Sequence, residues 1–240
     1  MDELTKDEQK RYHRHLILPE IGEKGQKKLK CAKVLVVGAG GLGSPVLLYL
    51  TAAGVGTIGI VDFDIVDESN LQRQVLYTTE DIGKTKTSIA EEKLSKLNPH
   101  VSFNLYKTRL DQANAEDIIK EYDLVIDCPD NFATRYIVSD ICKKLNKPHV
   151  FGSVSEFEGQ LSVFNYKNGP VYRDIFPESY SSDETTENSQ PGIIGVLPGI
   201  VGCMQANEAI KIITGAGEVL SGKLFIIDIL NNNFNILNIS

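Results

Sequence analysis

Residues 33–45 read KVLVVGAGGLGSP, and this stretch specifies the architecture of the chain. Its first five residues form a short, β-branched run that is typical of a strand buried on both faces of a parallel sheet. Gly38, Gly40 and Gly43 follow at the GxGxxG spacing, and a helical pattern then continues to Ala53. A strand, a glycine loop and a helix in this order predict the opening unit of a doubly wound α/β fold.

The pattern downstream extends this unit into a larger sheet. Residues 57–61 complete a right-handed strand, helix, strand unit, and alternation in LSVFNY, from residue 161, indicates a change to antiparallel pairing. We expect a Rossmann-like doubly wound, mainly parallel sheet extended by antiparallel C-terminal strands. The further strands are predicted at 101–106, 124–128, 150–154 and in a final hairpin (LFIIDI and FNILNI), and the further helices at 82–97, 111–121, 133–145 and 199–214.

The chain is expected to form a single domain over residues 1–240. Within it we distinguish an N-terminal helical arm (1–30), a nucleotide-binding half (31–155) and an antiparallel extension (156–240). The segment 173–192 is polar, acidic and too long for an ordinary connection, which indicates a crossover loop.

Bulk properties exclude several classes of function. The formal net charge of -7 argues against nucleic-acid binding, which needs clustered positive charge. No run of about 18 apolar residues is present to span a bilayer, and the N-terminus has no apolar signal core. We therefore expect a cytoplasmic protein without a membrane or nucleic-acid partner.

The glycine loop indicates a nucleotide site. Glycines allow the backbone to approach a phosphate closely, and the helix start offers unpaired N–H groups with a positive dipole end. Asp62 ends the second strand, where an acidic residue accepts hydrogen bonds from ribose hydroxyls. On these two features alone, a nicotinamide-dependent oxidoreductase is favoured over an ATP-using enzyme, because binding a dinucleotide is the common use of this fingerprint.

Three charged residues beyond the loop favour ATP. Arg73 and Lys86 supply cations suited to phosphate oxygens, and Asp130, directly after the fourth strand, supplies the hard oxygen that Mg²⁺ prefers. Nucleotidyl transfer needs such groups, because charge spreads over departing pyrophosphate, whereas hydride transfer does not.

Other interpretations of the same residues remain open. Arg73 could pair with Asp67 or Glu68 as a solvated loop residue. Lys86 could pair with surface carboxylates. Asp130 and Asn131 could be no more than the N-cap of the next helix. Their convergence at one sheet edge beside a phosphate loop makes the joint interpretation the stronger one.

At this point the sequence resembles the ThiF/MoeB/HesA family, bacterial relatives of ubiquitin-activating enzymes that adenylylate sulfur-carrier proteins. The likeness covers nearly the whole chain. It runs through RYHRHLILPEIGEKGQKKL, VLVVGAGGLGSP, VDFDIVDESNLQRQ, IGKTK, NPH, LVIDCPDN, EGQLSVF and GIVGCMQANEAIK. The resemblance implies ATP with Mg²⁺, a homodimer, and a ubiquitin-like carrier with a C-terminal Gly-Gly, in a molybdopterin-type or thiamine-type pathway.

The resemblance also implies roles for individual residues. Arg14, in RYHRH, would reach into the site of the neighbouring subunit as a second phosphate clamp; its other interpretation is a solvated helix charge. Asp130 would hold magnesium. The nucleotide would be contacted by Gly38, Gly40, Gly41, Gly43, Asp62, Ser69, Asn70, Leu71, Gln72, Arg73, Lys86, Asp130 and Asn131, with Arg73, Lys86, Asp130 and Arg14 as the catalytic set.

The sequence departs from the family pattern in two places. Many members bind a structural zinc through two CxxC pairs, but the first corresponding segment here reads VYRDIF and no second pair follows, so no zinc is expected. Some members carry a transfer cysteine in the crossover loop, and residues 173–192 contain none. The resemblance therefore does not imply a covalent transfer step through this loop.

Four functions remain to be separated. The leading one is adenylylation of a carrier protein. The others are ATP-dependent activation of a non-protein carboxylate, as in a tRNA-modification dehydratase, a NAD-dependent oxidoreductase, and a non-catalytic scaffold that binds a ubiquitin-like partner.

Overall fold

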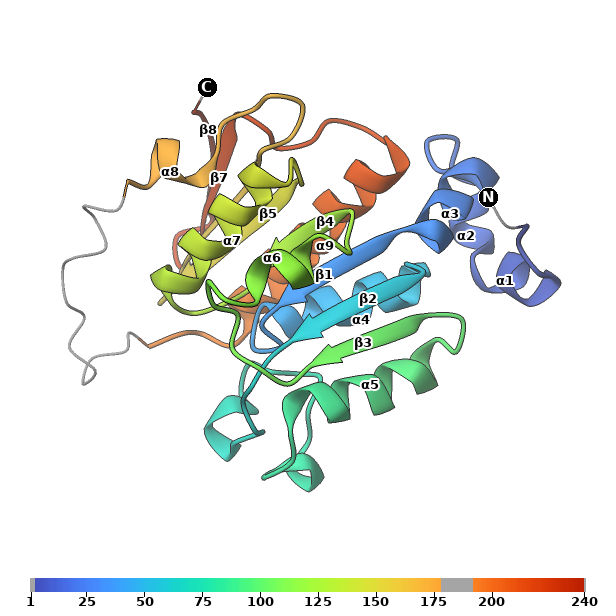
Figure 1. The fold of residues 1–240 in the computed structure, drawn as a ribbon, viewed down its shortest axis with the longest axis horizontal. Coiled ribbons are helices and arrows are strands. Elements are labelled where there is room, and N and C mark those ends of the chain that lie inside the picture. The colour runs from blue at the N-terminus through green and yellow to red at the C-terminus, as the bar shows by residue number, and fades with distance from the viewer. Residues whose placement is uncertain (1–2, 178–191, 240) are drawn as a thin grey trace.

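The computed structural model describes residues 3–177 and 192–239 (Figure 1). Within these residues, one mixed sheet of eight strands has the order β3-β2-β1-β4-β5-β6-β7-β8. The strands are β1 (Lys33–Val37), β2 (Thr57–Val61), β3 (Ser102–Tyr106), β4 (Leu124–Asp127), β5 (His149–Ser155), β6 (Glu158–Phe164), β7 (Lys223–Asp228) and β8 (Asn233–Asn238). Strands β1 to β5 pair in parallel, and β6, β7 and β8 are added antiparallel. The predicted fold class is confirmed.

Helices cover both faces of the sheet. The helices are α1 (Lys6–Arg11), α2 (His13–Leu16), α3 (Gly22–Cys31), α4 (Gly43–Ala53), α5 (Lys86–Leu97), α6 (Ala115–Ile119), α7 (Phe132–Lys144), α8 (Tyr172–Ile175) and α9 (Val196–Thr214), with 3₁₀ turns η1 (Glu68–Asn70) and η2 (Thr79–Asp81). On β1, Val34 and Val36 face the core under α4, α5 and α9, whereas Leu35 and Val37 face α6 and α7. Because successive side chains of a strand point to opposite faces, burial on both sides explains the unbroken apolar run.

The sheet order places a ligand site at the ends of β1 and β4. The chain leaves β1 toward β2 and β3 on one side, and the next strand, β4, pairs with the other side of β1. Such a reversal of strand order opens a crevice outside the carboxyl ends of the strands. The residues that follow β1, β2 and β4 therefore meet at one edge, and these are the residues that carry the predicted site.

Several local boundaries differ from the prediction. Helix α5 begins at Lys86, so Ile82 lies outside it and is exposed. The predicted helix 133–145 begins one residue earlier, at Phe132, and ends at Lys144. Of the predicted loop 173–192, residues 173–175 end helix α8, and residues 178–191 lie outside the described residues.

The N-terminal arm is packed against the opposite end of the sheet from these strand ends (Figure 1). Helices α4 and α5 run back against the strands, so their C-terminal ends lie beside the starts of the strands. Tyr12 contacts both of these helix ends. Its ring fills the space over Gly54, the C-cap of α4, and its hydroxyl accepts from Nδ2 of Asn98, the C-cap of α5, at 2.8 Å.

Among the described residues, every helix is too short or too polar to cross a bilayer.

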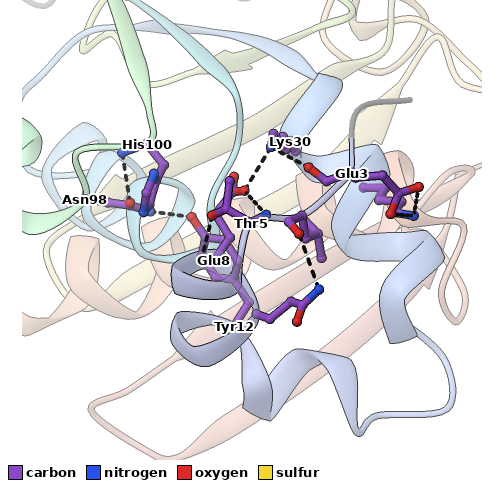
Figure 2. Close-up of polar contacts among 10 residues, drawn as sticks. Glu3, Thr5, Glu8, Tyr12, Lys30, Asn98 and His100 are labelled. Atoms are coloured by element: carbon purple, nitrogen blue, oxygen red, sulfur yellow. Dashed lines mark hydrogen bonds and ion pairs between the residues drawn. The ribbon is translucent and has the colours of Figure 1, made fainter.

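Polar contacts on buried atoms fix this arm (Figure 2). Glu8 caps α1 by accepting from Thr5 N at 2.8 Å, and Thr5 Oγ1 in turn accepts from Glu8 N. Lys30 of α3 forms an ion pair with the same carboxylate at 2.9 Å. Asn98 also donates to Thr51 O at 2.7 Å. The arm is thus docked on its own chain.

Candidate functional site

The glycine loop turns too tightly for other residues. Gly38 has a φ of +95°, and a β-carbon there would lie 2.8 Å from Cys128 O. A β-carbon on Gly43 would lie 2.0 Å from Gly38 O, which no side chain tolerates. Both positions require glycine for backbone reasons. The loop therefore folds back on itself and brings the start of α4 against the end of β1.

This turn leaves a row of backbone donors without acceptors. Within the described residues, the N–H groups of Gly40, Gly41 and Leu42 have no hydrogen-bond acceptor. They precede the eleven-residue helix α4, whose N-terminus carries the positive end of the helix dipole. Unpaired amides at a helix start form a site for a phosphate. This geometry is compatible with the predicted phosphate loop, whose role in binding remains a prediction.

Asp62 holds this loop in place. Its Oδ2 accepts from Ala39 N at 2.7 Å, and its Oδ1 accepts from Asp64 N at 2.8 Å. Burial raises the pKa of the Asp62 carboxyl, and the hydrogen bond from Ala39 and the charge of Lys86 act against that rise. The clamp was not predicted from the sequence. Each oxygen keeps a lone pair, so the predicted contact with a ribose hydroxyl remains compatible with it.

The segment after β2 lies beside the loop. Arg73 Nη1 donates to Ser69 O at 3.1 Å, and the Arg73 side chain passes 3.5 Å from where a β-carbon on Gly41 would lie. Arg73 is not paired with Asp67 or Glu68 within the described residues, so the surface-pair interpretation is not what the structure shows. The aliphatic part of the Arg73 side chain thus lies beside the glycine loop, and its guanidinium bonds to Ser69.

The other residues of this segment divide between the pocket and the fold. Asn70 turns its side chain back to accept from Asp67 N at 3.4 Å. Leu71 packs on the main core, and Gln72 lies against Gly195. Ser69 bonds Asp67 through its hydroxyl at 2.5 Å. Of these five predicted pocket residues, Arg73 is the one whose side chain lies against the glycine loop.

Lys86 is buried at the first position of α5. Its ammonium pairs with Asp64 Oδ2 at 2.9 Å, and its side chain is 5% exposed. Asp64, by contrast, is half exposed. Since Asp64 N is bonded to Asp62, this ion pair ties the lysine to the end of β2. Lys86 therefore pairs with a carboxylate, as the alternative interpretation predicted. This carboxylate, Asp64, lies at the edge of the predicted site.

Asp130 is an exposed carboxylate at the end of β4. Asn131 beside it is the N-cap of α7, accepting from Thr134 N at 2.9 Å, and its Nδ2 donates to Asp130 Oδ1 at 3.4 Å. The cap interpretation thus holds for Asn131 and leaves Asp130 available. Behind the turn, the buried Arg135 donates to Pro129 O at 2.8 Å. One carboxylate fits a Mg²⁺ that takes its remaining oxygens from phosphates and water.

Arg14 is not brought to this edge. It is exposed on the short helix α2 of the arm, at the other end of the sheet, and has no polar partner in the described part of the chain. Tyr12 and His15 on either side are anchored, His15 by a 3.0 Å bond between Nδ1 and Gln26 Oε1. The role of Arg14 in the site of another subunit therefore stays a prediction.

Two residues near the loop were missed. Asp64 partners Lys86, and the Asp-Phe-Asp spacing at the end of β2 was the signal for it. Tyr77 is buried and donates to Ala39 O at 2.9 Å. No sequence pattern marks Tyr77, because an isolated tyrosine in a loop carries no periodic signal. Among residues 3–177 and 192–239, no group of three or more His, Cys, Asp or Glu side chains could hold a metal by itself.

Comparisons with known proteins agree on one family. The model of the ThiF family matches residues 12–240. A probable molybdopterin-synthase adenylyltransferase of Porphyra purpurea is 53% identical over 90% of this chain and 57% of its own length. A sulfur carrier protein adenylyltransferase of Thermus thermophilus is 48% identical over 98% of this chain and 89% of its own length.

A solved structure agrees on the fold. The crystal structure of PaaA superposes with a TM-score of 0.87 at 23% identity, covering 100% of this chain and 86% of that one. The chain spans less than two thirds of the length of the Porphyra relative.

Proposed function

We propose that this chain, which belongs to the ThiF family, uses ATP to adenylylate the C-terminal glycine carboxylate of a ubiquitin-like sulfur-carrier protein and releases pyrophosphate. Relatives at about half identity are named adenylyltransferases of molybdopterin synthase or of a sulfur carrier protein. Both the molybdopterin and the thiamine type of pathway fit the proposal.

One observation carries the proposal: backbone amides without acceptors, the Arg73 side chain and the Lys86 ammonium lie near the ends of β1 and β2. Among the described residues the N–H groups of Gly40 and Gly41 have no acceptor, Cγ of Arg73 lies beside Gly41, and Lys86 is held at the end of β2 through Asp64. Three kinds of positive group at one point suit a polyphosphate. A nicotinamide site has no need of the buried lysine.

The amides, the two cationic side chains and Asp62 would have different roles in the reaction. The amides would hold one phosphate by hydrogen bonds, while Arg73 and Lys86 would steady the charge that develops on pyrophosphate as it leaves. Lys86 can exchange Asp64 for a phosphate oxygen without moving its helix, because Asp64 is half exposed. Asp62 keeps the loop in the shape that presents its amides.

Asp130 would hold Mg²⁺, which supplies further neutralisation of the phosphate charge when it is bound. The support is that this carboxylate is exposed and forms no ion pair within the described residues. Arg135 donates to the preceding carbonyl of Pro129, which anchors one side of the turn that carries Asp130. No zinc is part of the proposal.

The proposed assembly is a homodimer in which Arg14 of one copy serves the site of the other. Its support is that α2 is anchored on both sides of Arg14, which has no polar partner in residues 3–177 and 192–239, at the end of the sheet remote from the glycine loop. A single chain cannot bring Arg14 to its own loop without releasing Tyr12 from Gly54.

The test is incubation of the purified chain with ATP, Mg²⁺ and a ubiquitin-like carrier ending in Gly-Gly. We expect pyrophosphate release and a carrier whose mass increases by one AMP. A carrier lacking its last glycine is the matched control and should stay unmodified. Tight binding of NADH with no pyrophosphate release would replace the proposal by an oxidoreductase. Pyrophosphate released with a modified tRNA, but not with the carrier, would favour a dehydratase.

A further inference from the structure

Ala39, inside the glycine loop, is held at both of its backbone polar groups. Its N–H donates to Asp62 Oδ2 at 2.7 Å. Its carbonyl accepts from Tyr77 Oη at 2.9 Å, although the two residues are 38 positions apart. The tyrosine ring is buried, with 5% of the residue exposed. Two side chains from outside the loop therefore hold Ala39, in addition to the backbone bonds of Gly38 to Val61 and of Ser44 to Gly40.

The Tyr77 hydroxyl acts as the donor in this contact. Burial, together with the nearby carboxylates of Asp62, Asp81 and Asp64, raises the pKa of the phenol far above its usual value, so the proton stays on Oη. The same hydroxyl also lies 3.5 Å from the carbonyl of Lys86, at the start of α5. The shorter bond, to Ala39, determines where the hydroxyl points.

Peptide geometry gives this bond a consequence for Gly40. In a planar trans peptide, the carbonyl of one residue and the N–H of the next point in opposite directions. A carbonyl of Ala39 that is fixed toward the buried phenol therefore directs the Gly40 N–H away from it. That N–H has no acceptor within the described residues. Gly40 lacks a β-carbon, so its backbone torsions restrict the orientation of this peptide less than those of another residue would.

We propose that Tyr77 is a positioning residue that aims the Gly40 N–H at a phosphate of bound ATP. This inference rests on the proposed function. It assigns the buried hydroxyl a role that the packing of an aromatic ring does not require, since phenylalanine would fill the same volume. The amide would otherwise spend part of its time turned toward the interior, and its hydrogen bond to the phosphate would then be lost.

The experiment compares Tyr77→Phe with Tyr122→Phe. Tyr122 is equally buried, at 1% exposed, and its hydroxyl bonds Asn104 and Tyr106 on the opposite face of the sheet. Each variant deletes one buried hydroxyl, so loss of stability alone would affect both. We expect Tyr77→Phe to weaken ATP binding by about tenfold in titration calorimetry, whereas Tyr122→Phe stays within about twofold of the wild type.

Two further measurements separate positioning from general damage. In the adenylylation assay, Tyr77→Phe should raise the KM for ATP by the same factor and leave the KM for the carrier unchanged. In the ¹⁵N-labelled wild-type protein, ATP should shift the Gly40 amide resonance strongly, which keeps the inference testable if Tyr77→Phe does not fold. Unchanged ATP affinity in Tyr77→Phe, or a Gly40 resonance that ATP does not move, overturns the inference alone. A wild-type protein that binds no ATP overturns the proposed function with it.

Discussion

Lys86 and Asp130 occupy the same edge of the sheet but are held very differently. Lys86 is buried and paired with Asp64, whereas Asp130 is exposed and, among the described residues, its carboxylate accepts a hydrogen bond from the side-chain amide of Asn131 alone. A buried cation on a helix start keeps its position before any ligand arrives, at the cost of requiring a partner. An exposed carboxylate is free to meet a metal. This difference allows function and folding to be separated at Asp130.

Replacing Asp130 with alanine should therefore abolish activity and spare the fold. We expect the rate of ATP to pyrophosphate exchange to fall by about 100-fold or more, while the unfolding midpoint in urea stays that of the wild type. Asp117→Ala removes another exposed carboxylate, in α6 and far from the site, and should leave exchange unchanged. Exchange at the wild-type rate in Asp130→Ala would remove this residue from the proposed mechanism.

The N-terminal arm shows how a short element is stabilised by its surroundings. Helix α1 has only six residues, too few to persist alone in water. It is held by the reciprocal capping contacts of Thr5 and Glu8 and by the ion pair from Glu8 to Lys30 (Figure 2). The side chain of Glu8 is 4% exposed, so its charge depends on these partners. The arm is consequently sensitive to protonation of one carboxyl group.

This dependence predicts a pH effect with a definite sign. Burial alone would raise the pKa of Glu8, but hydrogen bonds from Lys30 and Thr5 outweigh burial and lower it below 4.5. A carboxyl whose pKa is lowered by folding stabilises the folded state above its unfolded pKa, and this contribution disappears as the pH falls through the folded value. Glu8→Gln should therefore lower the free energy of unfolding by about 1–3 kcal/mol at pH 7, and the difference from the wild type should shrink below pH 4.5.

Urea titrations from pH 7 down to pH 3 measure this difference. Glu3→Gln is the matched control, because Glu3 also pairs with a lysine of α3 but is 80% exposed. Its difference from the wild type should be small at every pH, as for other exposed ion pairs. A Glu8→Gln difference that persists undiminished at acid pH would show that the carboxylate charge is not what holds the arm.

In the whole molecule, the phosphate loop and the arm lie at opposite ends of the sheet (Figure 1). The loop follows the carboxyl end of β1, and Tyr12 of the arm sits on the C-terminal ends of α4 and α5. A site that uses both Arg14 and Asp130 must therefore be shared between two copies. Closed symmetric dimers provide two such sites, each with one residue from either copy.

Mixing two inactive variants tests this arrangement. Arg14→Ala and Asp130→Ala should each be inactive alone. After mixing under conditions that exchange subunits, each mixed dimer contains one site with both residues intact, so about a quarter of wild-type activity should return. The idea fails if both variants sediment like the wild type and exchange subunits, yet the mixture recovers no activity. Arg14 would then act in the site of its own chain or take no part in catalysis.

Local patterns in the chain were sufficient to predict the sheet and the tight turn of the glycine loop. An unbroken apolar run predicted β1, and three glycines at fixed spacing predicted the turn, because backbone sterics and burial act on neighbouring residues. The alternation in LSVFNY likewise predicted the antiparallel strand β6. Asp62 and Arg73 were identified through their spacing from these elements, although the clamp that Asp62 forms on Ala39 was not foreseen.

Contacts between distant parts of the chain account for the rest. Helix α5 starts at Lys86 because residues 83–85 bond to residues 65 and 66, which replaces helical hydrogen bonds by longer-range ones. The hydrophobic periodicity of a short stretch of sequence does not reveal such long-range pairing. The same holds for Tyr77, whose hydroxyl meets the glycine loop only after β1, α4 and β2 have packed. A side chain that acts across 38 residues leaves no local trace, since its partner is selected by the fold and not by its neighbours.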